Sequence, residues 1–299
     1  MTKSSPDVTK PENRARTAVP RARPALRTSA QTSVQTSAQT SVRATARSEQ
    51  SLTSPRRPIR QFVLTQPGEC PYLDGQVEQK LVTALDPADP EAYGALHRAG
   101  FRRSHEMAYR PACPTCDKCK SLRIDVNAFQ ANRTQGKLLR RHSGLKRSIA
   151  ELGPTQTSFE LFSHYTSTRH ADSEMASMGW RDYQALVLES GVDTHLIEWH
   201  DPAHEAGPKL VAACVIDVLA DGLSMVYSFF DTSRPADSLG NFMVLSLMEV
   251  CRTLQLPYLY LGYWVKGSAT MDYKAQYRAA EIFGPLGWQE MDKPDKRTS

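Results

Sequence analysis

Three segments in the second half of the chain are rich in apolar, β-branched and aromatic residues, and turn sequences separate them. They are residues 194–199, 209–219 and 223–229. Short runs of this composition, bounded by Gly, Pro and Asp, are typical of β-strands. The pattern therefore predicts three consecutive antiparallel strands, and residues 258–264, which follow Leu256-Pro257, predict a fourth.

Other segments carry apolar residues at the three- and four-residue spacing of an amphipathic helix. The clearest follows Asp237-Ser238-Leu239-Gly240, which we interpret as a helix cap, and continues to Leu254. Helical spacing also predicts helices within residues 165–170 and 180–189. A last helix is predicted from 269 to 280.

Three meandering strands, a helix and a strand that returns parallel to them form the core of an N-acetyltransferase-like fold. We therefore expect an α+β protein with a mixed sheet, although other α+β folds with a meander fit the same pattern. In the expected fold, an acyl donor binds where the central strands splay. Its phosphates lie at the next helix N-terminus, where unpaired amides and the helix dipole favour anions. Ser238 and Gly240 are the donor-binding candidates there.

The turn that enters this helix, residues 232–240, contains one glycine and one proline. Such a loop presents few close backbone amides to a pyrophosphate. The turn therefore argues against coenzyme A as the donor.

Composition changes along the chain and suggests a division into parts. The segment 32–42 repeats a four-residue, Ser/Thr-rich pattern, which is typical of disorder, with an organelle transit peptide as the alternative. The predicted parts are a disordered basic tail (1–58), a small cysteine-bearing N-terminal domain (59–132), a basic bridge (133–158), the acetyltransferase-like domain (159–290) and a flexible C-terminus (291–299).

The 299-residue chain has a net charge of +5, but this charge is unevenly distributed. Residues 1–60 carry twelve Lys/Arg against three Asp/Glu, a net charge of +9. The remaining residues carry 25 Lys/Arg against 29 Asp/Glu, a net charge of −4. A polyanion partner therefore needs a local basic patch. Residues 133–147 provide six cations and no acid: Arg133, Lys137, Arg140, Arg141, Lys146 and Arg147. This stripe suits contact with phosphates, and a solvated helix face is the alternative.

The chain shows no signal for a membrane or an oxidising compartment. Its longest apolar run, residues 210–216, ends at Asp217 and is far shorter than the roughly 20 residues of a membrane helix. The N-terminus lacks a secretory apolar core, and six cysteines are too few for a disulfide scaffold. We expect a cytoplasmic monomer without membrane contact.

Four of the six cysteines form the sharpest local signal. Cys113, Cys116 and Cys119 are separated by two residues each, and Cys70 is the obvious fourth ligand. Four thiolates suit a structural zinc ion or an iron–sulfur cluster, with free thiols as the alternative. Cys214 and Cys251 lie in apolar segments and are predicted core residues.

A series of short motifs occurs in a distinctive order. They are Glu69-Cys70-Pro71-Tyr72-Leu73, Gly100-Phe101-Arg102-Arg103-Ser104, Tyr109-Arg110-Pro111, Asp221-Gly222-Leu223-Ser224, Ser238-Leu239-Gly240, Tyr260-Leu261-Gly262-Tyr263-Trp264 and Met271-Asp272-Tyr273-Lys274. Over about residues 60–285 the chain thereby resembles the arginyl-tRNA–protein transferase family, and most closely its bacterial branch, the aspartate/glutamate leucyltransferases.

The resemblance implies an enzyme that moves leucine from its tRNA to proteins beginning with Asp or Glu and so marks them for N-degron degradation. Arginyl-tRNA is the alternative donor, because this chain has Thr270 where the family commonly has Lys. The chemistry requires no cofactor. A coenzyme A-dependent acetyltransferase and a non-catalytic, metal-knotted RNA-binding protein are the competing hypotheses.

Candidate residues follow for each step of this reaction. Asp231, and then Glu198, are candidates for orienting or deprotonating the amine. A cation must face the acidic side chain of the acceptor. The candidates for that role are Arg102, Arg103, Arg110, Arg169 and His170. In addition to Ser238 and Gly240, the candidates for contact with the tRNA and its aminoacyl end are Arg133, Lys137, Arg140, Arg141, Tyr263, Trp264, Lys266, Tyr273 and Lys274.

Overall fold

The structure is a computed structural model and describes residues 60–268 and 270–291. The described residues belong to one compact unit. The predicted tail (1–58) and all but Met291 of the predicted flexible C-terminus lie outside the described residues. None of the helices described is long and apolar enough to cross a bilayer.

In the described part of the chain, eight strands form a large sheet that contains both parallel and antiparallel pairs. In spatial order they are β14 (Gly287–Glu290), β13 (Ala280–Gly284), β7 (Cys119–Asp125), β12 (Tyr258–Val265), β11 (Gly222–Phe230), β10 (Lys209–Leu219), β9 (Thr194–Asp201) and β8 (Lys146–Ile149). The three antiparallel strands predicted by the apolar runs are confirmed, as is the fourth strand parallel to β11. The expected α+β class with a mixed sheet is therefore correct.

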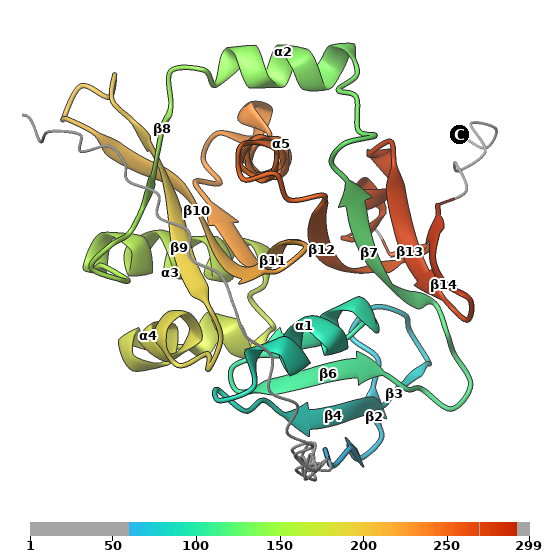
Figure 1. Cartoon of the computed structure of the whole chain (residues 1–299). Helices are drawn as coiled ribbons and strands as arrows, with labels where there is room; N and C mark the ends of the chain where they lie inside the picture. Colours follow the sequence, from blue (N-terminus) through green and yellow to red (C-terminus); the bar gives the residue numbers. More distant parts are fainter. Residues whose placement is uncertain (1–59, 269, 292–299) are drawn as a thin grey trace, which may run out of the picture. The chain divides into compact units, whose positions relative to one another are not determined.

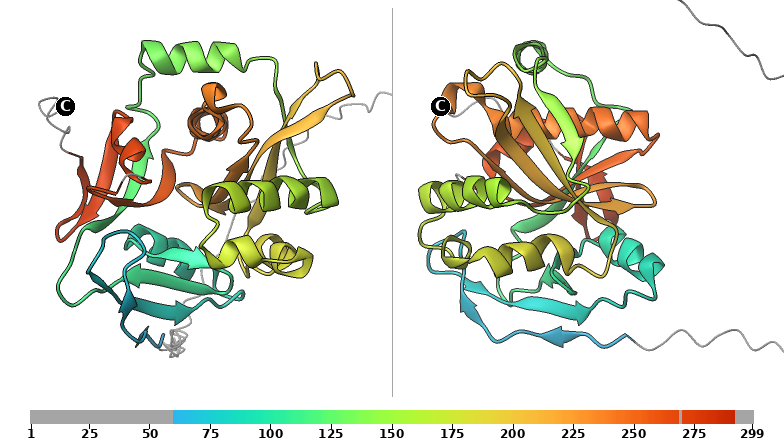
Figure 2. Two further views of the ribbon diagram at one scale, coloured as in Figure 1. Left: turned by 180° about the vertical axis from the view of Figure 1, so that it is seen from behind. Right: turned by 90° about the vertical axis from the view of Figure 1, so that its left-hand side faces the viewer.

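Helices cover both faces of this sheet (Figure 1, Figure 2). They are α2 (Arg133–Arg141), α3 (Gln156–Arg169), α4 (Trp180–Leu188) and α5 (Leu239–Thr253). α5 and α2 lie on one face, and α3 and α4 lie on the other. Neighbouring side chains of β10 alternate between the layers, because Ala212 and Cys214 join the α5 core whereas Ala213 joins the α3 core.

The N-terminal part builds a second, smaller sheet. Its strands, in spatial order, are β1 (Val63–Leu64), β4 (Lys80–Ala84), β6 (Met107–Pro111) and β5 (Arg102–Ser104), while β2 (Gly68–Glu69) pairs separately with β3 (Val77–Glu78). The helix α1 (Pro90–Arg98), which follows β4, was not predicted. The sequence Asp89-Pro90 is typical of a helix start, with a capping residue before a proline at the first helical position. In the structure the Asp89 side chain accepts a hydrogen bond from the Ala92 amide.

The predicted parts do not separate as compact units. β7, which belongs to the expected N-terminal domain, lies inside the large sheet between β12 and β13. The expected basic bridge is likewise no linker, because it supplies α2 and the edge strand β8. The N-terminal and C-terminal parts therefore share one sheet, in which β7 pairs with both β12 and β13.

The last predicted helix is wrong. In place of a helix over residues 269–280, the structure has the single 3-10 turn η3 (Asp272–Gln276), followed by β13. Ala279 has a φ of +57°, which a right-handed helix does not tolerate. Two further 3-10 turns, η1 (Glu174–Ser177) and η2 (Pro235–Asp237), precede α4 and α5.

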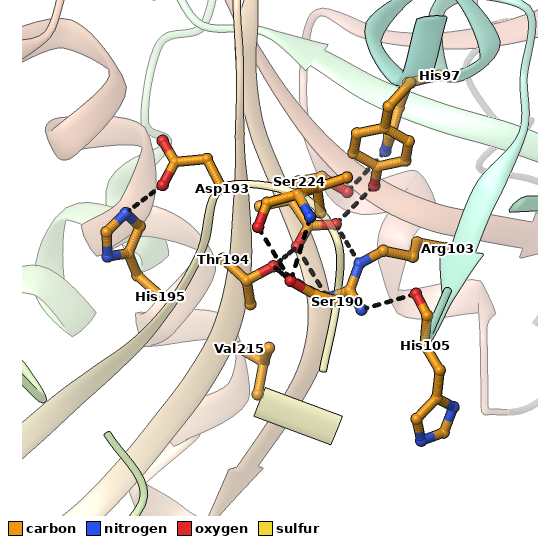
Figure 3. Close-up of polar contacts among 12 residues, drawn as sticks. His97, Arg103, His105, Ser190, Asp193, Thr194, His195, Val215 and Ser224 are labelled. Atoms are coloured by element: carbon orange, nitrogen blue, oxygen red, sulfur yellow. Dashed lines mark hydrogen bonds and ion pairs between the residues drawn. The ribbon is translucent and has the colours of Figure 1, made fainter. Parts of the chain in front are cut away.

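A buried polar network joins the small sheet to the large one (Figure 3). Arg103 on β5 forms a bidentate ion pair with Asp217 on β10, with both N–O distances at 2.8 Å and both side chains fully buried. Tyr93 and Thr194 donate to the same carboxylate at 2.6 and 2.7 Å. Arg103 also donates to the carbonyl oxygen of His105. The network satisfies both charges and fixes the position of the small sheet.

The Asp217→Asn variant should be strongly destabilised, because Arg103 then stays buried without its counter-charge. We expect a loss of about 3–5 kcal/mol in the free energy of unfolding, measured by urea denaturation. The control is Asp117→Asn, which breaks the pair with Lys120 at a carboxylate that is 90% exposed, and it should cost less than about 1 kcal/mol. Equal losses in the two variants would contradict the role given to Arg103 and Asp217.

Candidate functional site

The large sheet opens between its two parallel strands. β11 and β12 pair through three residues each, from Gly222 to Ser224 and from Tyr258 to Tyr260. β12 then continues along β7 with a shift of register, and Gly262 lies at this bulge with a φ of +76°, a conformation that suits glycine. The two strands therefore diverge and leave a gap in the middle of the sheet.

A cavity with two connected lobes occupies this gap. The first, which we call the helix lobe, has a volume of about 460 Å³ and lies at the start of α5. The second, which we call the lysine lobe, has a volume of about 780 Å³ and reaches Tyr72, Leu261 and Lys274. Residues that line both lobes include Tyr165, Arg169, His170, Met225, Ser228 and Tyr273. Because α5 and α3 cover opposite faces, the cavity extends through the sheet.

The N-terminus of α5 borders the helix lobe without a side-chain cap. Ser238 precedes the helix in a left-handed conformation with a φ of +48°, and its side chain makes no capping hydrogen bond. The predicted cap is therefore wrong, although Ser238 and Gly240 both line the lobe. A Cβ on Gly240 would lie 3.2 Å from the Phe230 ring, so glycine keeps this wall close-packed. Uncapped amides and the helix dipole make this lobe suitable for an anion.

A groove of about 190 Å³ connects the basic helix α2 with the same end of α5. Lys137 and Arg141 line it on one side, and Ser238 and Asn241 on the other. Arg141 also donates to the carbonyl oxygen of Ala236 at 2.7 Å, which ties α2 to the turn before α5. Ser238 and Asn241 line both the groove and the helix lobe, so the two are continuous.

Four predicted donor residues belong to α2, and all four are exposed: Arg133, Lys137, Arg140 and Arg141. Two of them, Lys137 and Arg141, line the groove. Lys146 and Arg147, the other two residues of the predicted basic stripe, lie on the edge strand β8. The α2 part of the stripe is therefore an exposed helix face, and two of its residues line the groove that leads to the cavity.

Neither predicted catalytic carboxylate lines the cavity. Asp231 accepts hydrogen bonds from Lys209 Nζ at 2.8 Å and from Ser233 N and Oγ at 3.0 and 2.6 Å. Burial alone would raise the pKa of Asp231, but these hydrogen bonds outweigh it and lower the pKa to about 2. Glu198 lies on the α4 side of the sheet near Tyr183, and burial raises its pKa. The geometry therefore speaks against both as the base.

Three of the predicted acceptor-binding arginines also lie outside the cavity. Arg103 is engaged with Asp217 in the buried network. Arg110 donates to a backbone carbonyl at 3.4 Å and covers the ring of Phe101. Arg102 is buried, and its Nη1 and Nη2 donate to the carbonyl oxygens of Phe101 and Gly262. These three arginines thus contact protein groups outside the cavity.

Arg169 and His170, at the end of α3, do line both lobes. Arg169 is exposed and His170 is half-buried. Burial, and next the charge of Arg169, lower the pKa of His170, so its imidazole is neutral at pH 7. The His170 ring stands edge-on to Tyr165, with 5.6 Å between ring centroids.

The remaining predicted donor residues divide into two groups. Tyr273 and Lys274 line the cavity, whereas Tyr263, Trp264 and Lys266 do not. The Tyr263 hydroxyl donates to backbone carbonyls of the small sheet at 2.9 and 3.2 Å, so this ring is part of the core. Stacking of a base on Tyr263 or Trp264 is therefore not supported by their positions.

Three aromatic residues of the cavity walls, besides the predicted Tyr273, were not predicted from the sequence. Tyr165 and Phe230 line the helix lobe, and Tyr72 lines the lysine lobe. Tyr72 lies two residues after Cys70, within the motif Glu69-Cys70-Pro71-Tyr72-Leu73. Membership of this motif was the sequence signal that could have identified Tyr72. Tyr165 and Phe230 look like core residues in sequence, because only the divergence of β11 and β12 brings them to a cavity.

The four clustered cysteines are free and half-buried. Burial, and next the charges of Cys70, Cys113 and Cys116, raise the pKa of Cys119 to about 11, so the four thiols are neighbours. However, within residues 60–268 and 270–291 no three His, Cys, Asp or Glu side chains converge as metal ligands do. Soft thiol donors suit zinc or an iron–sulfur cluster, but this arrangement is not a ligand shell. A metal here stays a prediction.

The chain is similar to one family of proteins over nearly its whole described length. A model described as "Arginine-tRNA-protein transferase, N terminus" matches residues 68–137, and the corresponding C-terminal model matches residues 157–284. The aspartate/glutamate leucyltransferase of Caulobacter vibrioides is 45% identical over 81% of this chain and 87% of its own length. The protein of that name from Gluconacetobacter diazotrophicus is 43% identical over 81% and 91%.

Among solved structures, FemX is similar with a TM-score of 0.44 and 9% sequence identity, over 66% of this chain and 67% of its own. The L-PGS of Bacillus licheniformis is similar with a TM-score of 0.38 and 11% identity, over 62% and 53%.

The Asp231→Asn variant should lower stability in a pH-dependent way. Because the folded-state pKa of Asp231 is about 2 and lies below its ordinary value of 3.8, its ionised form stabilises the fold above about pH 4. This contribution is lost as the pH falls towards 2. Thermal unfolding should show the variant less stable than the native protein at pH 6, with a difference that shrinks by pH 2.5. Lys209→Met should behave alike, and a pH-independent difference would refute the assignment.

Proposed function

The chain belongs to the arginine-tRNA-protein transferase family, and we propose that it transfers leucine from leucyl-tRNA to proteins whose first residue is Asp or Glu. The new N-terminal leucine marks these proteins for degradation as N-degrons. The enzyme is thus an aminoacyltransferase with two macromolecular substrates, an aminoacyl-tRNA and a protein N-terminus.

The observation that carries this proposal is the continuous path from α2 to the divergence of β11 and β12. Exposed cations of α2 can contact the phosphates of the acceptor stem. The groove beside Lys137 and Arg141 leads to Ser238 and Asn241, and from there into the helix lobe. A tRNA 3′ end that follows this path brings its last phosphate to the uncapped N-terminus of α5 and its aminoacyl group into the cavity.

The topology also supports an N-acetyltransferase-like architecture for the large sheet. In that architecture the acyl donor binds between two parallel strands that separate, beside the helix that connects them. Here β11 and β12 separate after three residue pairs, and α5 is the connecting helix. The donor in this protein is an aminoacyl ester in place of an acyl-coenzyme A, in keeping with the glycine-poor turn before α5.

The reaction joins the α-nitrogen of the acceptor to the leucyl carbonyl carbon and breaks the ester bond to the 3′-terminal ribose. The amine loses one proton, and the ribose oxygen gains one. An α-amine has a pKa near 7.7–8.0, so a useful fraction is neutral at pH 7 and needs only a modest base. Holding the two ends together supplies most of the acceleration.

His170 is well placed to accept the proton from the amine. It lines both lobes, and burial beside Arg169 keeps its imidazole neutral. Arg169 is exposed at the same wall and can attract the negatively charged substrates. Neither Asp231 nor Glu198 takes part in this step, since both lie outside the cavity.

A transfer assay with matched donors and acceptors tests the proposed function. The purified protein is incubated with labelled leucyl-tRNA, arginyl-tRNA or acetyl-coenzyme A, and with peptides that begin with Asp, Glu or Ala. We expect label from leucyl-tRNA on the Asp and Glu peptides and none on the Ala peptide. Transfer from arginyl-tRNA alone would replace the donor, and acetylation or tRNA binding without transfer would overturn the proposal.

Charge reversal on α2 tests the tRNA path. The double variant Lys137→Glu/Arg141→Glu should bind tRNA at least 10-fold more weakly at 50 mM salt, because it converts two phosphate contacts into repulsion, and the salt dependence of binding should become shallower. Arg181→Glu, an exposed position at the start of α4 on the opposite face, is the control and should bind as the native protein does. Equal binding by both variants would place the tRNA elsewhere.

A further inference from the structure

Lys274 contributes an amine to the lysine lobe but is almost inaccessible to bulk solvent. The residue is 7% exposed, and its Nζ donates to the carbonyl oxygen of Tyr263 at 2.7 Å. The amine lies beside the bulge of β12, because a Cβ built on Gly262 would be in ordinary van der Waals contact with Nζ at 3.9 Å. The backbone hydrogen bond therefore fixes the amine at the diverging end of β12.

A second buried cation, the guanidinium of Arg102, contacts the same bulge. Arg102 is 5% exposed, and its Nη2 donates to the carbonyl oxygen of Gly262 at 3.4 Å. The rings of Tyr260 and Tyr263 flank its guanidinium at 5.4 and 5.7 Å. Two buried cations thus donate to consecutive backbone carbonyls, those of Gly262 and Tyr263.

These cations have no counter-charge of their own in the described residues. Within 60–268 and 270–291, neither Arg102 nor Lys274 forms an ion pair with a carboxylate. Asp172 lines the lysine lobe but is exposed and makes no ion pair with Lys274. Burial, and next the charge of Arg102, lower the pKa of Lys274 to about 7. A buried cation without a partner is costly to keep charged, unless a ligand brings the opposite charge.

We infer that Lys274 Nζ recognises the side-chain carboxylate of the acceptor's first residue. The inference rests on the proposed function and names the group that selects its substrates. An Asp or Glu side chain that enters the lysine lobe supplies the missing counter-charge and accepts a charge-assisted hydrogen bond. Asn and Gln have nearly the same shape but leave the cation uncompensated, so they are rejected.

A carboxylate suits this position better than the phosphate of the donor that the sequence suggested for Lys274. The helix lobe already offers uncapped amides to a phosphate, and Lys274 is not among the residues that line it. The amine is also bound to backbone within a lobe whose walls include Leu261 and Met271. A short side chain at the end of a flexible polypeptide reaches such a place more readily than a nucleic-acid backbone does.

The test compares Lys274→Met with the native protein on matched peptides that begin with Asp, Asn, Glu and Gln. Met keeps the length and volume of the side chain and removes its charge. We expect kcat/KM for the Asp and Glu peptides to fall roughly 10- to 100-fold through KM, whereas the Asn and Gln peptides change less than threefold. At saturating Asp peptide the rate should stay within threefold of the native rate.

Two controls make the outcome decisive. Lys80→Met applies the same substitution in the small sheet, outside the cavity, and should leave the selectivity unchanged. Thermal unfolding and tRNA binding report whether Lys274→Met is folded, and Lys274→Gln provides a second neutral variant if it is not. An unchanged Asp-to-Asn ratio, or an equal fall of kcat for all peptides with KM unchanged, would overturn the inference. Absence of transfer by the native protein would instead refute the proposed function.

Discussion

The divergence of β11 and β12 is the constraint from which the site follows. The two strands pair through three residues each, and beyond them β12 stays in the sheet through its other edge, which pairs with β7. β7 comes from the N-terminal part of the chain, so that part supports β12 where β11 leaves it. The start of α5 and the end of α3 both line the gap, and they lie on opposite faces of the sheet. One interruption in a ladder of hydrogen bonds thus creates a cavity that residues from both faces line.

Buried charges in this protein serve two opposite purposes. Arg103 and Asp217 are fully compensated, and Tyr93 and Thr194 occupy the remaining acceptor positions of the carboxylate. That network holds the small sheet against the large one. Lys274 is buried to a similar extent, yet its Nζ donates to a backbone carbonyl and forms no ion pair among the described residues. A saturated pair stabilises the fold, whereas an uncompensated cation at a cavity wall is free to interact with an incoming anion.

The loop that carries Cys70 also borders this cavity. Cys70 lies directly before Pro71 and Tyr72, and these two residues line the lysine lobe. The neighbouring thiols therefore lie beside a loop that forms part of the cavity wall. The N-terminal part thus contributes β7 to the sheet and this loop to the cavity.

The sequence by itself determined the strands and helices between residues 194 and 254, because the two-residue and 3.6-residue repeats report which side of each element is buried. It also identified the family, and it placed Ser238, Gly240, Arg169 and His170 at the site. The tertiary structure alone decided which charges face the cavity. Arg103 and Asp217 are 114 residues apart, and no local pattern reveals that they are paired. The left-handed Ala279, which ends the predicted last helix, and the bulge of β12 beside Lys274 likewise depend on strand pairing with β7. Periodicity describes burial but not long-range partners.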